Sequence, residues 1–299
     1  MSSRFAFGAL CIIVTVILWS GWYVVIRLGL TSSQLDVQDL AALRFGVAGI
    51  LMLPVVWKRG LALDRLGWRG LLAIALGGGA PFALLVGAGL VYAPVSHASA
   101  ITQGMVPLAV GVVAAVVLKE RVTTSHLLGF ALIIAGAAVI AGISLASLAS
   151  RETLGHAFFV AAAFLWAGYT VALRKAHLEG FHAPAIAAVA SLIFYVPVYL
   201  VFRGQHLLAT PVHDLVLQGV CQGVLTAVVS MLFYSRGVAL LGATSAGAFV
   251  AFGPVAAALM AIVILGETPR LSDWAGIAVI TLGVLLASGT FRGWRAQPT

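Results

Sequence analysis

Ten apolar runs, each about as long as a bilayer is thick, account for most of this 299-residue chain. A helix needs about 20 apolar residues to cross the hydrocarbon core, because every backbone N–H and C=O group must be paired inside lipid. The runs fall at residues 5–28, 37–57, 70–92, 97–118, 124–145, 154–175, 184–203, 214–236, 244–265 and 271–291. They leave only short connections, so the sequence predicts an all-α membrane protein with ten transmembrane helices.

The composition supports a membrane protein and excludes the soluble classes. Of all residues, 62% are hydrophobic and 9% are charged, whereas a soluble domain carries about 25% charged residues. The mean hydropathy is +1.11, and a soluble chain of this length would need far more polar surface to cover its core. These values exclude a secreted domain and a cytosolic enzyme.

The positive charge is spread along the chain and not gathered in one block. The formal net charge is +8, and the Lys and Arg residues lie between the apolar runs, where they orient a membrane protein. We therefore expect contacts with membrane lipids and no nucleic-acid partner. The two cysteines, Cys11 and Cys221, both lie in apolar runs, so neither a disulfide framework nor a zinc-binding spacing is present.

The two halves of the chain repeat each other at an offset of 147 residues, and Trp19-Ser20-Gly21-Trp22 aligns with Trp166-Ala167-Gly168-Tyr169. At the same offset Arg27 aligns with Arg174, Pro107 with Pro254, Glu120 with Glu267, and Gly129, Gly136 and Gly142 with Gly276, Gly283 and Gly289. The sequence therefore predicts two five-helix domains, residues 1–147 with helices one to five and residues 148–299 with helices six to ten.

The odd number of helices in each repeat fixes their relative orientation. The second repeat must enter the membrane from the opposite side, which predicts an inverted repeat. With the N-terminus in the cytoplasm, twelve of the 17 Lys and Arg residues lie on that side, and the other five are Arg27, Arg44, Arg151, Arg203 and Arg270. This count places both termini in the cytoplasm. Two antiparallel copies can exchange conformations, so the repeat predicts alternating access around a site near the midplane.

Two motifs recur in both repeats. The first helix of each carries a Trp-x-Gly-aromatic turn, and the fourth has a central proline and a terminal glutamate, in Leu118-Lys119-Glu120-Arg121 and Leu265-Gly266-Glu267-Thr268. In these motifs the chain resembles the EamA-type carriers of the drug/metabolite transporter superfamily over essentially its whole length. The resemblance implies a ten-helix exporter of amino acids or related metabolites in the bacterial inner membrane. Within the superfamily we favour an aromatic amino-acid exporter.

Three residues are predicted to act as hinges. Pro107 and Pro254 lie near the middles of the fourth and ninth runs, where a proline removes a backbone hydrogen bond and bends a helix. Gly79, within the Gly-Gly-Gly-Ala-Pro segment at 77–81, loosens the third run. For the two prolines a static kink is the alternative, and for the glycine segment the alternative is that it lines the pore.

Aromatic and polar side chains inside the runs are the candidates for substrate binding. The aromatic ones, which either stack on an apolar substrate or pack helices together, are Trp19, Trp22, Trp166 and Tyr169. The polar ones, which either contact the ammonium and carboxylate of an amino acid or link two helices, are Ser99, Thr102, Gln103, Gln222 and Ser245.

Arg44 and His97 are ionisable residues inside or at the start of a run. Arg44 lies about two turns into the second run. It either receives a substrate carboxylate or reaches toward the interface and pairs with Asp36 or Asp39. His97 starts the fourth run, and we expect it to be solvated or to serve the helix end there, not to relay protons.

The ends and faces of several helices have a structural interpretation. Glu120 and Glu267 end their helices at opposite membrane faces, and we interpret both as residues that fix the following loop. The glycine rows at 129, 136 and 142 and at 276, 283 and 289 allow helices to approach closely within the bundle. A monomer is therefore favoured over a homodimer formed through the fifth or tenth helix.

Missing motifs narrow the function further. The sequence has no GxxxxGK[ST], HExxH or GxSxG motif, so we expect no ATP use, no cofactor, no metal and no enzymatic activity. No Asp or Glu lies in the central part of any run, which favours facilitated transport over proton coupling. Two alternatives stay open. One is a carrier of anionic metabolites such as sugar phosphates or nucleotide sugars, and the other is an intramembrane enzyme or a non-transporting scaffold.

Overall fold

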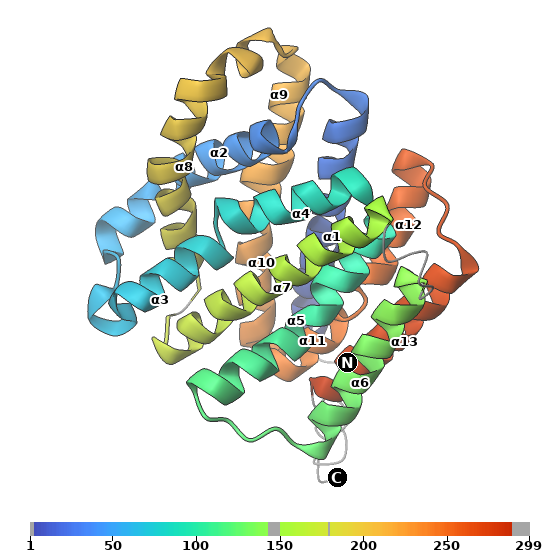
Figure 1. The fold of residues 1–299 in the computed structure, drawn as a ribbon. Helices are drawn as coiled ribbons and strands as arrows, with labels where there is room; N and C mark the ends of the chain where they lie inside the picture. The colour runs from blue at the N-terminus through green and yellow to red at the C-terminus, as the bar shows by residue number, and fades with distance from the viewer. Residues whose placement is uncertain (1–2, 143–149, 179, 289–299) are drawn as a thin grey trace.

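The computed structural model describes residues 3–142, 150–178 and 180–288, which form a bundle of helices (Figure 1). The elements are α1 Ser3–Ser32, α2 Val37–Arg59, α3 Leu63–Gly77, α4 Ala80–Tyr92, α5 Val95–Val117, α6 Thr124–Ala141, α7 Arg151–Lys175, α8 His182–Ala209, α9 Val212–Gln218, the π-helix η2 Gly219–Val229, α10 Ser230–Leu241, α11 Ala243–Val250, α12 Gly253–Leu265 and α13 Leu271–Ala287. These ranges contain no strand. The predicted all-α membrane class is confirmed.

Nine helical segments among the described residues are long and apolar enough to cross a bilayer. Three of them combine shorter elements, namely α3 with α4, α9 and η2 with α10, and α11 with α12. The tenth predicted run begins with α13, which is apolar but shorter, and its last residues lie outside the described ranges. The count of ten spans and the inverted arrangement stay predictions.

The predicted hinge residues lie in three different settings. Gly79 separates α3 from α4, and a Cβ there would overlap the carbonyl oxygen of Ala75. Pro254 lies in the first turn of α12, just after the break that separates it from α11. Pro107 lies inside an uninterrupted α5. The two prolines are equivalent in the repeat alignment, yet only Pro254 follows a break between two helices. Their role as hinges stays a prediction.

The break before α12 is stabilised from another helix. The carbonyl oxygen of Gly253 accepts a hydrogen bond of 2.9 Å from the buried Ser20 hydroxyl on α1. A backbone carbonyl left unpaired in an apolar interior would cost several kcal/mol, on the order of 2–7. Ser20, within the tryptophan motif of α1, therefore ties this motif to the point where the second repeat is interrupted.

Helices α6 and α13 lie side by side and are held together through glycines (Figure 1). A Cβ at Gly129 would lie 2.7 Å from the carbonyl oxygen of Gly283, and a Cβ at Gly283 would lie 2.7 Å from that of Gly129. Gly136 and Gly276 face each other in the same way at 2.8 Å. These rows pack two helices of one chain, as the sequence predicts.

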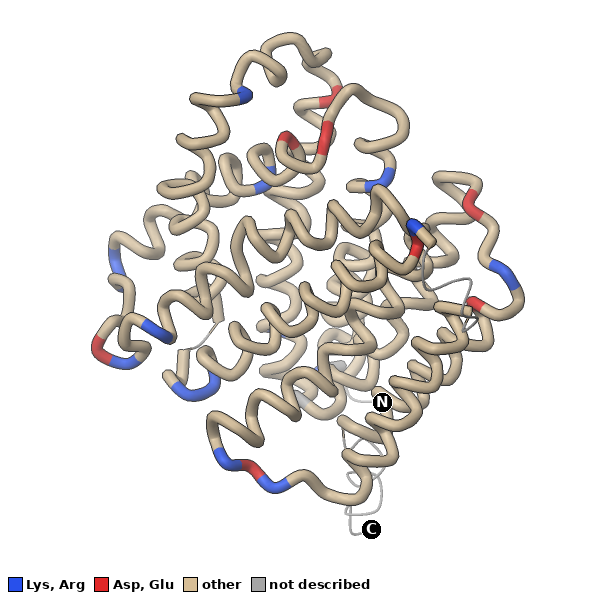
Figure 2. Tube along the Cα trace, in the orientation of Figure 1, with Lys and Arg blue, Asp and Glu red and all other residues tan. Residues whose placement is uncertain are grey.

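Charged residues separate along the bundle (Figure 2). Most Lys and Arg lie at one edge, where α2 leads to α3, α5 to α6 and α7 to α8, while most Asp and Glu lie toward the opposite edge together with a few Arg. Because a bilayer excludes charge from its core, these two edges mark the two membrane faces.

Candidate functional site

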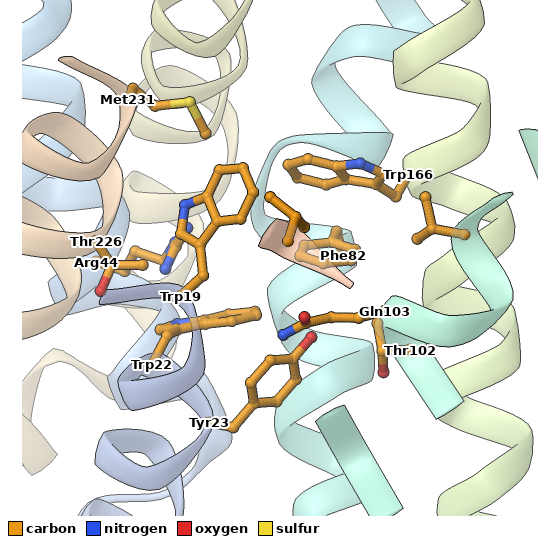
Figure 3. Close-up of a pocket in the computed structure, with 12 residues that line it drawn as sticks. Trp19, Trp22, Tyr23, Arg44, Phe82, Thr102, Gln103, Trp166, Thr226 and Met231 are labelled. Atoms are coloured by element: carbon orange, nitrogen blue, oxygen red, sulfur yellow. The ribbon is translucent and has the colours of Figure 1, made fainter. Parts of the chain in front are cut away.

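A cavity of about 140 Å³ lies between helices of both halves of the chain (Figure 3). Its walls come from α1, α2, α4, α5, α7, η2, α10 and α11. The lining residues are Trp19, Trp22, Tyr23, Arg44, Phe82, Thr102, Gln103, Val106, Trp166, Thr226, Met231 and Val250. The wall is mostly aromatic and apolar, and none of these residues is an Asp or Glu.

Aromatic rings form a continuous wall on one side. Trp22 stacks on Phe82 with ring centroids 5.7 Å apart and planes 18° apart. Phe82 in turn contacts Trp166 at 5.1 Å. Figure 3 shows these rings and Trp19 turned toward one shared space. Such a wall suits a flat apolar group, because each further ring contact contributes about 0.5–1.5 kcal/mol beyond the area that it buries.

The indole N–H groups are tied to α10 and η2. Trp19 Nε1 donates to Ser230 Oγ at 2.9 Å. Trp22 Nε1 lies 3.4 Å from Gln222 Oε1, and Gln222 Nε2 donates to Gln218 Oε1 at 2.6 Å. With their polar atoms engaged elsewhere, Trp19 and Trp22 offer only their apolar rings to the cavity. The π-helix that carries Gln222 is a rare element that is frequent at functional sites.

Arg44 supplies the one cation among the lining residues. Its Cζ lies 4.6 Å from the ring centroid of Trp22 and 5.6 Å from that of Phe45. Its Nε and Nη1 atoms are inaccessible to solvent and have no hydrogen-bond partner among the described residues. A buried donor left unpaired costs about 1–3 kcal/mol, and more when it is charged. The fold therefore keeps an unsatisfied cation beside the cavity.

The predicted pairing of Arg44 with Asp36 or Asp39 is wrong. Asp36 forms an ion pair with Arg203 on α8. Asp39 accepts hydrogen bonds from other groups on α8, namely His206 at 2.7 Å and the Tyr199 hydroxyl. Each carboxylate is thus bound by side chains of α8, and Arg44 has no counter-ion among the described residues.

Six of the ten predicted binding residues line the cavity: Trp19, Trp22, Arg44, Thr102, Gln103 and Trp166. The remaining four lie elsewhere. Ser99 bonds the carbonyl oxygen of Ser96, and Gln222 anchors Trp22 from behind. Tyr169 lines a small adjoining cavity that it shares with Arg44. Ser245 is partly buried in α11 and does not line this cavity.

Six lining residues were not predicted: Tyr23, Phe82, Val106, Thr226, Met231 and Val250. Two of them carry a signal in the sequence that could have predicted their place in the cavity wall. Phe82 follows the helix break at Gly79, and Tyr23 directly follows the tryptophan motif. The apolar ones carry no sequence signal, because a Val or Met that faces a cavity resembles one that faces lipid.

Two ion pairs link the halves of the chain at opposite edges of the bundle. Arg27 on α1 binds Glu267 after α12 at 2.9 Å, and Arg174 on α7 binds Glu120 after α5 at 2.7 Å. The loops that carry the two glutamates lie at opposite edges in Figure 1. We call these edges the Glu267 end and the Glu120 end. Each arginine binds the glutamate of the other repeat.

The Glu267 end is the more tightly joined of the two. There Glu267 Oε2 also accepts a hydrogen bond of 2.9 Å from the N–H of Val95, at the start of α5. Arg27 also donates to the carbonyl oxygen of Leu90 at 2.5 Å. These side chains are 25% and 20% exposed, whereas both side chains of the Arg174–Glu120 pair are 47% exposed. The Glu267 end is therefore closed by a network, and the Glu120 end by a single ion pair.

A bundle of membrane-spanning helices around an apolar cavity, with an arginine in its wall, is typical of a membrane transporter. The chain belongs to the EamA-like transporter family, whose model matches residues 6–142 and again residues 153–289. The resemblance drawn from the motifs is thereby confirmed.

Relatives of similar length are named as transporters. The chain is 29% identical over 291 residues to a probable terminal-alkyne amino-acid exporter of Streptantibioticus cattleyicolor, covering 96% of this chain and 95% of the relative. It is 28% identical over 287 residues to an uncharacterized transporter of Archaeoglobus fulgidus, covering 93% and 96%. A crystal structure of 21% identity shares the fold, with a TM-score of 0.61 over 96% of this chain and 97% of that one.

Proposed function

We propose that this protein exports amino acids, preferentially aromatic or apolar ones, across the bacterial inner membrane by facilitated alternating access. The observation that carries the proposal is that Arg44 lines an aromatic cavity while its Nε and Nη1 atoms have no hydrogen-bond partner among the described residues. The name of the relative from Streptantibioticus cattleyicolor, a probable exporter of an amino acid, supports the same substrate class.

The Arg44 guanidinium is suited to a carboxylate. A buried arginine donates charge-assisted hydrogen bonds to a carboxylate, and these are about twice as strong as bonds between neutral groups. The described residues give Nε and Nη1 no acceptor, so a substrate carboxylate would supply one once the side chain turns toward the cavity. A bound carboxylate would act as the counter-ion of Arg44, and this ion pair would offset the desolvation free energy of the buried guanidinium.

The rest of the cavity is suited to the other parts of an amino acid. Gln103 and Thr102 line it from α5, and the Thr102 hydroxyl has no partner among the described residues. An amide oxygen and a hydroxyl can accept hydrogen bonds from an ammonium group. The rings of Trp22, Phe82 and Trp166 would then enclose the side chain of the substrate.

Two structural pairings support the inverted repeat and alternating access. The repeat offset of 147 residues maps one ion pair onto the other, because Arg27 aligns with Arg174 and Glu120 with Glu267. The glycine pairs between α6 and α13 exchange in the same way. A chain with this symmetry can close either end with the same kind of ion pair, and we propose that it does so in turn. Both termini then lie in the cytoplasm, on the Glu120 end.

Facilitated transport agrees with the charges of the cavity. None of the described lining residues is an Asp or Glu, so the cavity itself holds no carboxylate that could exchange a proton with each substrate. Sugar phosphates and nucleotide sugars are less well matched, because a phosphate carries more charge than the single Arg44 offsets.

Counterflow in proteoliposomes tests the proposal. Vesicles preloaded with unlabelled phenylalanine should take up labelled phenylalanine, and leucine or tryptophan should compete while phenethylamine, which lacks the carboxylate, should not. A proton ionophore should leave the uptake unchanged. Trp19→Ala should reduce exchange, and Trp57→Ala, 88% exposed and outside the cavity, is the matched control. Exchange of sugar phosphates but of no amino acid would overturn the substrate assignment.

A further inference from the structure

Three titratable side chains from three helices form a buried cluster at the Glu267 end. His97 Nδ1 on α5 lies 3.0 Å from His156 Nε2 on α7. His97 Nε2 lies 3.2 Å from Asp273 Oδ1 on α13. The three residues are 2%, 8% and 3% exposed. The expectation of a solvated His97 is therefore wrong, because α7 and α13 cover the start of α5.

Few other charges surround this cluster. Glu152 lies one turn before His156 on α7, and its carboxylate is 3.8 Å from Arg270, just before α13. The Arg27–Glu267 pair reaches the start of α5 at Val95, two residues from His97. None of the cluster residues lines the central cavity.

The cluster belongs to one end only. At the repeat offset of 147 residues, His97 aligns with Thr244 and His156 with Ala9, while Asp273 aligns with His126. Neither Thr244 nor Ala9 can take up a proton at physiological pH. A proton bound at the Glu267 end therefore has no equivalent site at the Glu120 end.

The geometry accommodates one added proton but not two. With both histidines neutral, His156 Nε2 donates to His97 Nδ1 and the His97 Nε2 N–H faces Asp273. One added proton binds His156 Nδ1 while the proton on His156 Nε2 moves to His97 Nδ1, so that His97 becomes an imidazolium whose two N–H groups face His156 Nε2 and the Asp273 carboxylate. A second added proton on His156 places two N–H donors and two positive charges opposite each other across 3.0 Å.

We propose that His97, His156 and Asp273 form a proton-binding site that keeps the Glu267 end closed until a second proton enters and separates α5 from α7. The proposal rests on the alternating access proposed above. The proton regulates the opening and is not carried across, because the cluster lies outside the cavity and the other repeat lacks it. Acidification at this end raises the fraction of open protein.

Thiol labelling of the purified protein tests the site without any transport assay. Ser99→Cys, placed two residues after His97 at a buried position, is the reporter in a background in which Cys11 and Cys221 are replaced by alanine. Labelling by a maleimide is followed from about pH 8 to about pH 4, a range that extends below the ordinary titration of histidine, because the second proton enters 3.0 Å from an imidazole that is already charged. At each pH the labelling rate of the folded protein is divided by the rate of the same protein unfolded in detergent. This ratio removes the pH dependence of the reaction between the maleimide and the thiol.

The normalised labelling should rise several-fold on acidification, and His156→Gln should abolish this rise, because glutamine can donate to His97 but cannot take up a proton. His97→Gln is the second variant if the first does not fold. His126→Gln, at the repeat position of Asp273, is the matched control and should keep the rise.

A pH response retained in the His156 and His97 variants, or absent from the parent protein, would overturn the proposal. Uphill amino-acid accumulation driven by a pH gradient would also overturn it, because the proton would then be carried. Failure of amino-acid counterflow would leave the labelling result intact, so the two proposals can fail separately.

Discussion

Replacing Arg44 by leucine is expected to lower amino-acid exchange about 10- to 100-fold and at the same time to raise the Tm of the protein. The loss follows from about 1.5–3 kcal/mol for hydrogen bonds between a charged group and the substrate carboxylate. The gain in stability follows because the Nε and Nη1 atoms of the guanidinium are buried without a hydrogen-bond partner among the described residues. Its contact with the Trp22 ring contributes about 1–2 kcal/mol, less than the several kcal/mol that burying an ion costs.

Exchange and thermal unfolding measured on the same preparations check both halves of this prediction. Arg44→Lys keeps the charge and should retain part of the exchange, whereas Arg69→Leu on the exposed part of α3 should change neither quantity. A lower Tm with unchanged exchange would show that Arg44 is a structural residue, and the carboxylate assignment would then fail.

Glu267→Gln is expected to raise the fraction of protein open at the Glu267 end about tenfold or more. Glu120→Gln is expected to raise the fraction open at the Glu120 end less than about fivefold. Removing one partner of a buried ion pair costs about 3–5 kcal/mol, and an exposed pair is worth about 0.2–1 kcal/mol. The Arg27–Glu267 pair lies nearer the buried case and also binds the backbone at Leu90 and Val95. Glutamine can still accept the Val95 hydrogen bond, so the substitution removes the charge and little else.

Labelling at the Ser99→Cys reporter measures the opening of the Glu267 end, and labelling at Ala246→Cys, the buried equivalent of Ser99 in the other repeat, measures the opening of the Glu120 end. The two glutamine variants are each other's control, because they occupy equivalent positions of the two repeats. Equal labelling of both variants and the parent would contradict the asymmetry between the two ends. A larger effect of Glu120→Gln would reverse the assignment of the closed end.

The sequence predicts the elements of this fold well, because bilayer thickness and hydropathy limit where a helix can begin and end. The run predicted at 97–118 is observed as α5, Val95–Val117. The repeat alignment also brings out Arg27, Arg174, Glu120 and Glu267 as equivalent residues. Their pairing across the two halves is seen only in the structure, because the alignment gives equivalent positions and not contacts.

The site is predicted less completely, since hydropathy gives depth along a helix but not the face that a side chain occupies. Gln222 and Trp22 were both expected to contact substrate, and Gln222 instead holds the indole of Trp22 from outside the cavity. The burial of His97 depends on α7 and α13, which lie far away in the sequence. Contacts of this kind arise only from the tertiary arrangement.

The position of a bound substrate tests the central claim most directly. We would determine the structure of the protein with para-bromophenylalanine and locate the bromine by its anomalous scattering. The account predicts one bromine site within the ring wall of Trp22, Phe82 and Trp166, with the carboxylate of the ligand on the Arg44 guanidinium. A bromine site elsewhere in the protein, with the Arg44 guanidinium still unpaired, would contradict it.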